Sequence, residues 1–172
     1  MKIGEIAGDV MAFRARATVW WPTPPVDDSL RFALCEATEA LDAKLRSNPL
    51  YARNHERHVD CDGELAQCAI MLMTALGEGH RYGSIDFVAR DGVDGVDEVV
   101  RMVANAFGEY VLSPRAPTWR LWAECALIQI ALYLGPDKLA RTIDRELAKI
   151  EARHLGDATR NAITICRRAA GG

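Results

Sequence analysis

Glu36 and Glu39 are three residues apart, which places both carboxylates on one side of a helix at ~100° per residue. Their neighbours on that side are small or apolar rather than Lys, Ser or Gln: Phe32, Cys35, Ala40 and Ala43. Two uncompensated charges among such residues need a partner, because burying them is very costly. A divalent cation is one partner that suits two carboxylates.

A second group of oxygen-bearing side chains follows at helical spacing. Asp60, Glu64 and Gln67 occupy positions i, i+4 and i+7, within an arc of about 60° on one helix face, whereas Asp62 points the other way. A short connection favours antiparallel pairing of the two helices. In that pairing the two acidic groups converge.

The chemistry of these groups favours a hard cation and a phosphate-containing ligand. Oxygen ligands without a thiol or a histidine pair suit Mg²⁺ or Mn²⁺, which keep water ligands that phosphate can displace. Lys44, Arg53 and Arg57 are candidates for holding phosphate oxygens, and Asn54 for contacting a base edge. Aromatic candidates for base stacking are Trp20, Trp21 and Tyr51, with packing as the alternative role for the tryptophans.

Other interpretations stay open from the residues alone. The acids could be paired internally with arginine or lysine, with Asp60 serving as no more than a helix N-cap. A zinc site is a second alternative, although the spacing of its candidate ligands fits no common finger: His55, His58, Cys61 and Cys68.

Composition sets the broad class. The chain has 172 residues, of which 49% are apolar and 26% charged, with a net charge of −3. These values predict one globular domain and give no general attraction for nucleic acid or acidic membranes. We expect no membrane span and no signal peptide. Three of the five cysteines, Cys35, Cys68 and Cys125, lie within apolar helical runs, which indicates a reducing, cytoplasmic location.

Hydrophobic periodicity predicts an all-α fold, a bundle of five to six helices in a single domain over residues 1–172. An N-terminal helix and a Pro-rich connector occupy 1–26, the acid-bearing helix pair 27–78, and a lid-like loop with further helices 79–172. The expected helices of the bundle are 3–20, 27–46, 60–76, 97–112, 119–134 and 137–154. A short helix at 157–168 follows the bundle, and 85–88 could be a strand. The charges of 137–153 predict a solvated face of an outer helix.

The segments 28–41 and 64–72 resemble the MazG-like all-α nucleoside triphosphate pyrophosphohydrolases, whose pattern is E-x-x-E on one helix and E-x-x-D on the next. The resemblance implies that Glu36, Glu39 and Glu64 are Mg²⁺ ligands and catalytic residues. Gln67 stands where the family pattern has Asp, so it would offer a carbonyl oxygen without a charge. Asp60, on the same face, is then a candidate for the missing acid.

The implied reaction is hydrolysis of a nucleoside triphosphate to a nucleoside monophosphate and pyrophosphate, with Mg²⁺ or Mn²⁺ as cofactor. The resemblance also implies a homodimer or higher homo-oligomer. Because Gln67 departs from the pattern, a catalytically weak bundle that binds a nucleotide or a protein partner is the alternative. A purely structural helical protein is a third possibility.

Overall fold

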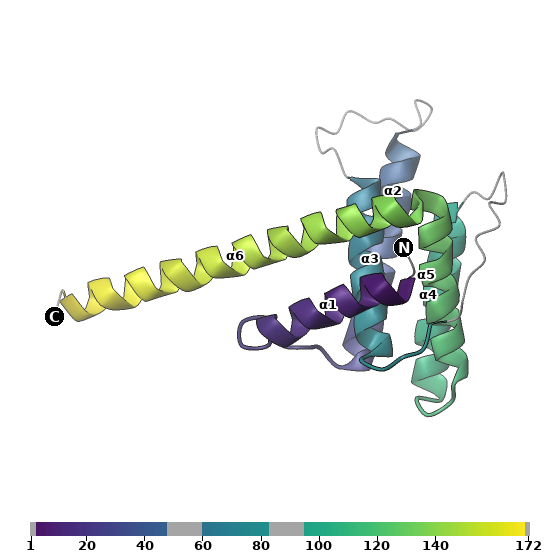
Figure 1. Ribbon diagram of the computed structural model, residues 1–172, viewed down its shortest axis with the longest axis horizontal. Coiled ribbons are helices and arrows are strands. Elements are labelled where there is room, and N and C mark those ends of the chain that lie inside the picture. The colour runs from purple at the N-terminus through teal and green to yellow at the C-terminus, as the bar shows by residue number, and fades with distance from the viewer. Residues whose placement is uncertain (1–2, 48–59, 83–94, 171–172) are drawn as a thin grey trace.

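The chain folds into six α-helices in the computed structural model, which describes residues 3–47, 60–82 and 95–170, with side chains as far as residue 156. The first and last helices cross the intervening ones, which stand side by side (Figure 1). In chain order the helices are α1 (Ile3–Ala17), α2 (Val26–Arg46), α3 (Cys61–Leu76), α4 (Gly95–Leu112), α5 (Thr118–Leu134) and α6 (Pro136–Ala170). The prediction of an all-helical chain is confirmed for the described residues.

The acid-bearing helices α2 and α3 run antiparallel and make the most extensive contact between any two elements (Figure 1). The prolines at 22, 24 and 25 set the start of α2, because proline cannot continue a preceding helix but fits the N-terminal boundary of a new one. Gly77 ends α3 with φ of 80°, a conformation that strains residues with a Cβ. The hairpin that the sequence predicts is therefore present.

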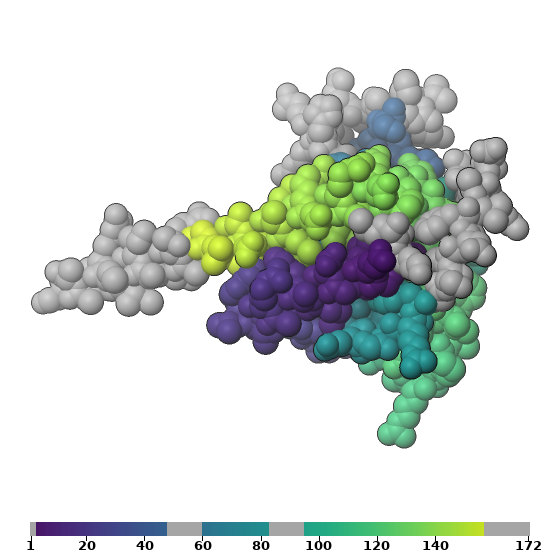
Figure 2. All heavy atoms as spheres, viewed as in Figure 1, coloured from purple at the N-terminus to yellow at the C-terminus, as the bar shows by residue number. Residues whose placement is uncertain are grey.

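Helix α3 lies at the centre of the core. All of its residues from Leu65 to Leu76 except Gln67 are buried, and it contacts α1, α2, α5 and α6. Its apolar surface is covered within the chain, so burial of α3 requires no second copy. Figure 2 shows α1 and α6 lying next to each other across one face of the molecule, in agreement with their direct contact.

Several predicted boundaries differ from the structure. The two helices predicted at 137–154 and 157–168 are one continuous helix, α6, because Gly156 is tolerated inside a long helix. Asp27 and Asp28 are the capping residues that the sequence favours for α2, but Pro25 occupies the N-cap position and both aspartates lie in the first turn. The strand considered at 85–88 lies outside the described residues.

None of the described helices is both long enough and apolar enough to cross a membrane.

Candidate metal centre

Three carboxylates from two helices meet at one point on the surface of the α2–α3 pair. Glu36 and Glu39 come from successive turns of α2, and Glu64 comes from the first turn of α3. One carboxylate oxygen from each residue lies within 4.8 Å of the other two. The convergence expected from antiparallel pairing is therefore present for these three residues.

The site faces solvent more than the helical wheel suggested. Glu36 and Glu64 are half-buried, whereas Glu39 is exposed. Phe32 is 54% exposed and Cys35 is exposed as well, because α2 packs through the neighbouring alanine stripe of Ala33, Ala37 and Ala40. The expectation that both glutamates lie on a packing face was wrong for Glu39, and the cluster is open to a ligand from outside.

Glu36 has the strongest electrostatic perturbation in the cluster. Burial is the main cause, and a hydrogen bond with Glu64 and the charges of Glu64, Glu39 and Glu146 act in the same direction, so the pKa of Glu36 is raised to about 8. Without a cation, Glu36 therefore keeps its proton to a higher pH than an ordinary glutamate, which reduces the repulsion within the cluster. A cation that binds here takes the place of that proton.

The donor set fits a hard divalent cation. Three carboxylates within coordinating distance of one another supply oxygen ligands and up to three negative charges, and the exposed side leaves positions for water. Among the described residues, no thiol or histidine contributes to this group. The zinc alternative gains no support: burial raises the pKa of both Cys61 and Cys68, which disfavours the thiolate, and His55 and His58 lie outside the described residues.

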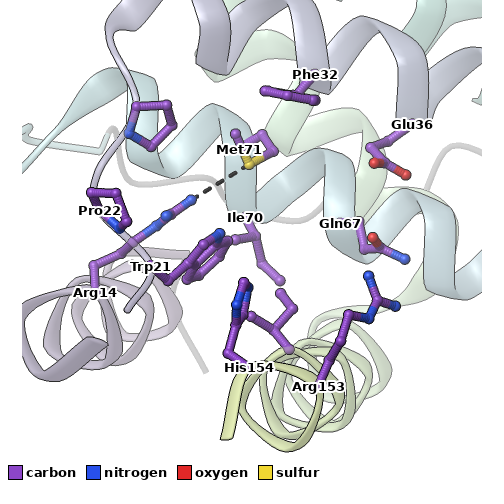
Figure 3. Close-up of a pocket in the computed structure, with 12 residues that line it drawn as sticks. Arg14, Trp21, Pro22, Phe32, Glu36, Gln67, Ile70, Met71, Arg153 and His154 are labelled. Carbon is purple, nitrogen blue, oxygen red and sulfur yellow. Dashed lines mark hydrogen bonds between the residues drawn. The ribbon is translucent and has the colours of Figure 1, made fainter. Parts of the chain in front are cut away.

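Gln67, the residue at the fourth family position, contacts an acid that comes from α6. Its amide Nε2 donates to Glu146 Oε2 over 3.5 Å. The amide oxygen and nitrogen of Gln67 diverge from the same carbon. Because the nitrogen faces Glu146, the oxygen is turned away from Glu146. In Figure 3 that oxygen lies on the side of Gln67 nearer to Glu36.

Glu146 was missed from the sequence, where the charges of 137–153 were assigned to a solvated face. It is only 3% exposed, and its Oε1 accepts from Lys149 Nζ at 2.7 Å and from Arg145 Nε at 3.2 Å. Gly63 makes room for it, because a Cβ at that position would lie 3.2 Å from Glu146 Oε1. The apolar residues Ile143, Leu147 and Ile150 lie at helical spacing on either side of Glu146, and this spacing is the signal that could have placed it on the inner face.

Asp60 does not join the three glutamates. It occupies the N-cap position of α3 without a side-chain capping bond, and its Oδ2 lies 2.5 Å from Arg145 Nη2. In the described part of the chain the cluster contains Glu36, Glu39 and Glu64 without Asp60. The acid that contacts Gln67 is instead Glu146 from α6.

The predicted substrate-binding residues are only partly described. Lys44 lies two turns after Glu36, with its Nζ 5.8 Å from the ring centroid of Tyr133 on α5. Arg53, Asn54 and Arg57, together with Tyr51, lie outside the described residues. Of the predicted lid residues, His80 Nε2 lies 3.6 Å from Glu124 Oε2 and the His80 ring packs on Tyr82.

A pocket of about 400 Å³ adjoins the acidic cluster (Figure 3). Glu36 and Gln67 lie at one end, and Arg14 and Trp21 lie at the other. Trp20 packs against Phe13 and lies near His154, so only Trp21 of the two predicted stacking tryptophans lines this pocket. The remaining lining residues are Pro22, Pro24, Phe32, Ile70, Met71, Ile150, Arg153 and His154.

Comparisons with known proteins gave no match: no protein-family model, no curated protein and no solved structure is similar to this chain.

Proposed function

We propose that this protein is a Mg²⁺- or Mn²⁺-dependent nucleotide pyrophosphohydrolase that converts a nucleoside triphosphate to the monophosphate and pyrophosphate. One observation carries the proposal: Glu36, Glu39 and Glu64, from two facing helices, place their oxygens within 4.8 Å of one another at a solvent-accessible position. The type of reaction is inferred from the resemblance of residues 28–41 and 64–72 to the MazG-like pattern. The hydrophobic core supports the site by fixing α2 against α3.

The three glutamates are the residues that would hold the ion, which when bound polarises phosphoryl oxygens and lowers the pKa of a coordinated water. Glu39 is the most accessible of the three, so it is the best placed to orient an attacking water molecule. Glu36 must give up its proton before it can act as a ligand, because a ligating carboxylate is deprotonated. Gln67 contributes an uncharged oxygen on the side that faces Glu36.

A second candidate function, metal-dependent nucleotide binding without turnover, is favoured by the contact between Gln67 and Glu146. The fourth family acid is absent from α3, and the acid that lies nearby is already neutralised by Lys149 and Arg145. A site with an amide at the fourth position can still bind a metal–nucleotide complex, but that amide cannot serve as a base toward the attacking water.

The test of the enzyme is pyrophosphate release. The purified chain is incubated with common and modified ribo- and deoxyribonucleoside triphosphates, with Mg²⁺ or Mn²⁺, and the products are separated by ion-exchange chromatography. We expect pyrophosphate and monophosphate in equal amounts, with loss of activity in Glu64→Gln and no change in Asp42→Asn. Asp42 is the matched control because it lies on α2 but pairs with Arg46 at 2.6 Å, outside the cluster.

Failure to release pyrophosphate from any substrate, by a folded protein that still binds metal and nucleotide in calorimetry, would favour the binding function. If the folded protein binds neither metal nor nucleotide, the three glutamates have a structural role only. Restoring the family acid separates the two functions further: Gln67→Asp combined with Glu146→Gln increases turnover if the site lacks only that acid. The second substitution is needed because the introduced aspartate would otherwise face the carboxylate of Glu146.

The proposal includes a homo-oligomer, as the family resemblance implies. Exposed apolar side chains gather where α4 ends and α5 begins, with Val111 59%, Leu112 84% and Leu121 60% exposed. Side chains of this kind are a suitable surface for a second copy. Light scattering coupled to size-exclusion chromatography measures the oligomeric state. A monomeric mass at a protein concentration of about 10⁻⁴ M would contradict a homo-oligomer.

A further inference from the structure

Arg14 is a buried cation at the end of the pocket opposite the acidic cluster. It lies in the last turn of α1 and is 1% exposed, although arginine is seldom buried without a paired acid. It lines the pocket of about 400 Å³ that α1, α2, α3 and α6 form with the connector after α1 (Figure 3). Its charge therefore lies at a partly open cavity that is large enough for a small organic molecule.

The contacts of the guanidinium satisfy it incompletely. Nε donates to Thr74 Oγ1 at 3.2 Å, and Nη2 donates to the sulfur of Met71 at 3.5 Å, which is a weak acceptor. Nη1 is buried and has no hydrogen-bond partner. No carboxylate of the described residues forms an ion pair with Arg14, so its charge has no counter-ion in this part of the structure.

Burial lowers the pKa of Arg14 to about 10, which still leaves the side chain charged at neutral pH. Arg153 and His154 of α6 line the same pocket, and Glu36 is the one carboxylate among the lining residues. A buried, charged group with a free donor is costly to keep unless something compensates it. The lining thus has an excess of positive charge.

We propose that this pocket is an oxyanion-binding site in which Arg14 is the buried recognition group for a phosphate or carboxylate of a small organic ligand. The anion accepts from Nη1, and it displaces the weak sulfur contact at Nη2 to give the two parallel bonds that a guanidinium offers. Arg153 supplies a second positive charge from α6. The body of the ligand lies along Ile70 and Met71 toward Gln67.

Trp21 controls access to the recognition group. The guanidinium lies over its ring, with Arg14 Cζ 3.3 Å from the ring centroid. Trp21 itself is half-buried and belongs to the connector after α1, so its indole can move without unfolding a helix. Ligand binding exposes Nη1 by shifting this ring, and it consequently changes the fluorescence of Trp21.

The experiment uses the full chain in metal-free Tris–chloride buffer without a chelator, because chelators are themselves carboxylates. Inorganic phosphate, citrate and a nucleoside monophosphate are titrated separately by calorimetry and by tryptophan fluorescence at constant ionic strength. The phosphate and citrate arms distinguish the two kinds of oxyanion. Since no metal is present, the result does not depend on the proposed pyrophosphohydrolase activity, and each can fail while the other holds.

We expect saturable binding of at least one probe, a loss of affinity of roughly tenfold or more in Arg14→Met, and a smaller loss in Arg153→Gln. Arg16→Met is the matched control, because Arg16 lies on α1 but is exposed, and it should leave affinity unchanged. The melting temperature of Arg14→Met should equal or exceed that of the wild type, since an uncompensated buried charge is removed.

The fluorescence change should disappear in Trp21→Phe while calorimetric binding persists. In the wild-type protein, ¹⁵N resonances of the Arg14 side chain should shift on addition of the probe, a readout that needs no substitution in the pocket. Absence of saturable binding by all three probes, each at a concentration of about 10⁻² M, would overturn the proposal. Equal affinity in Arg14→Met and wild type would also overturn it.

Discussion

Gln67 on α3 and Glu146 on α6 are in direct contact, with Gln67 Nε2 3.5 Å from Glu146 Oε2, although 79 residues separate them in the chain. The contact joins α3, which carries Glu64 of the carboxylate cluster, to the long helix α6. It also explains why a neutral side chain is suited to position 67. A carboxylate there would face the nearly buried carboxylate of Glu146.

Gln67→Glu should therefore destabilise the metal-free protein by roughly 1–3 kcal/mol, because the hydrogen bond is replaced by repulsion between two partly buried carboxylates. Adding Glu146→Gln should recover most of that loss, since one donor and one acceptor are restored. Urea unfolding of the four proteins of this double-mutant cycle measures the coupling. Additive effects of the two substitutions would show that the side chains do not interact.

The stability of the metal-free protein should fall as pH rises from about 4.5 to about 8. Over this interval the folded state keeps the proton of Glu36, whose pKa is raised from 4.5 to about 8, whereas the unfolded chain has released it. The folded state thus binds more protons, and the free energy of unfolding decreases with pH. Thermal unfolding from about pH 5 to about pH 9, compared with Glu36→Gln, covers most of the interval between the ordinary and the raised pKa of Glu36 and tests this prediction. A variant with the same pH slope as the wild type would assign the effect to other groups.

Divalent metal should raise the melting temperature, and the gain should depend on the three glutamates. At a free concentration about 100 times the Kd, one bound ion adds about 2.7 kcal/mol to the free energy of unfolding. Glu39→Gln should weaken Mn²⁺ binding by about tenfold or more, because a charged ligand is lost. Asp42→Asn on the same helix should bind as the wild type does. Calorimetry gives the affinities, and addition of EDTA should reverse the thermal shift.

Asp60→Asn should leave metal affinity unchanged within about twofold, in contrast to Glu64→Gln. Asp60 pairs with Arg145, and both side chains are about half exposed, at 47% and 48%. An exposed pair of this kind contributes about 1 kcal/mol or less to stability. The comparison of these two variants by Mn²⁺ titration decides whether Asp60 belongs to the site. A large loss of affinity in Asp60→Asn would place it there.

Local sequence was enough to predict the acidic cluster. Glu36 and Glu39 share a helix face through their spacing, and Glu64 reaches them because antiparallel helices joined by a short connection pack together. The ends of α3 and α5 were also predictable, because a glycine follows each helix and glycine readily adopts the positive φ that ends a helix. In the structure Gly77 and Gly135 have φ near 80°. These features depend on periodicity and on residues that are close in the chain.

The burial of Glu146 and Arg14 was decided by tertiary structure. Both are charged, and local sequence places such residues at the surface. Glu146 is buried because α6 crosses α3 at Gly63, which has no side chain to block it, and Arg14 is buried because α1 packs on Thr74 and Met71 of the same helix. The sequence alone determined which groups could bind a metal. The crossing of α1 and α6 over α3, a relation between segments at least 57 residues apart, decided what surrounds them.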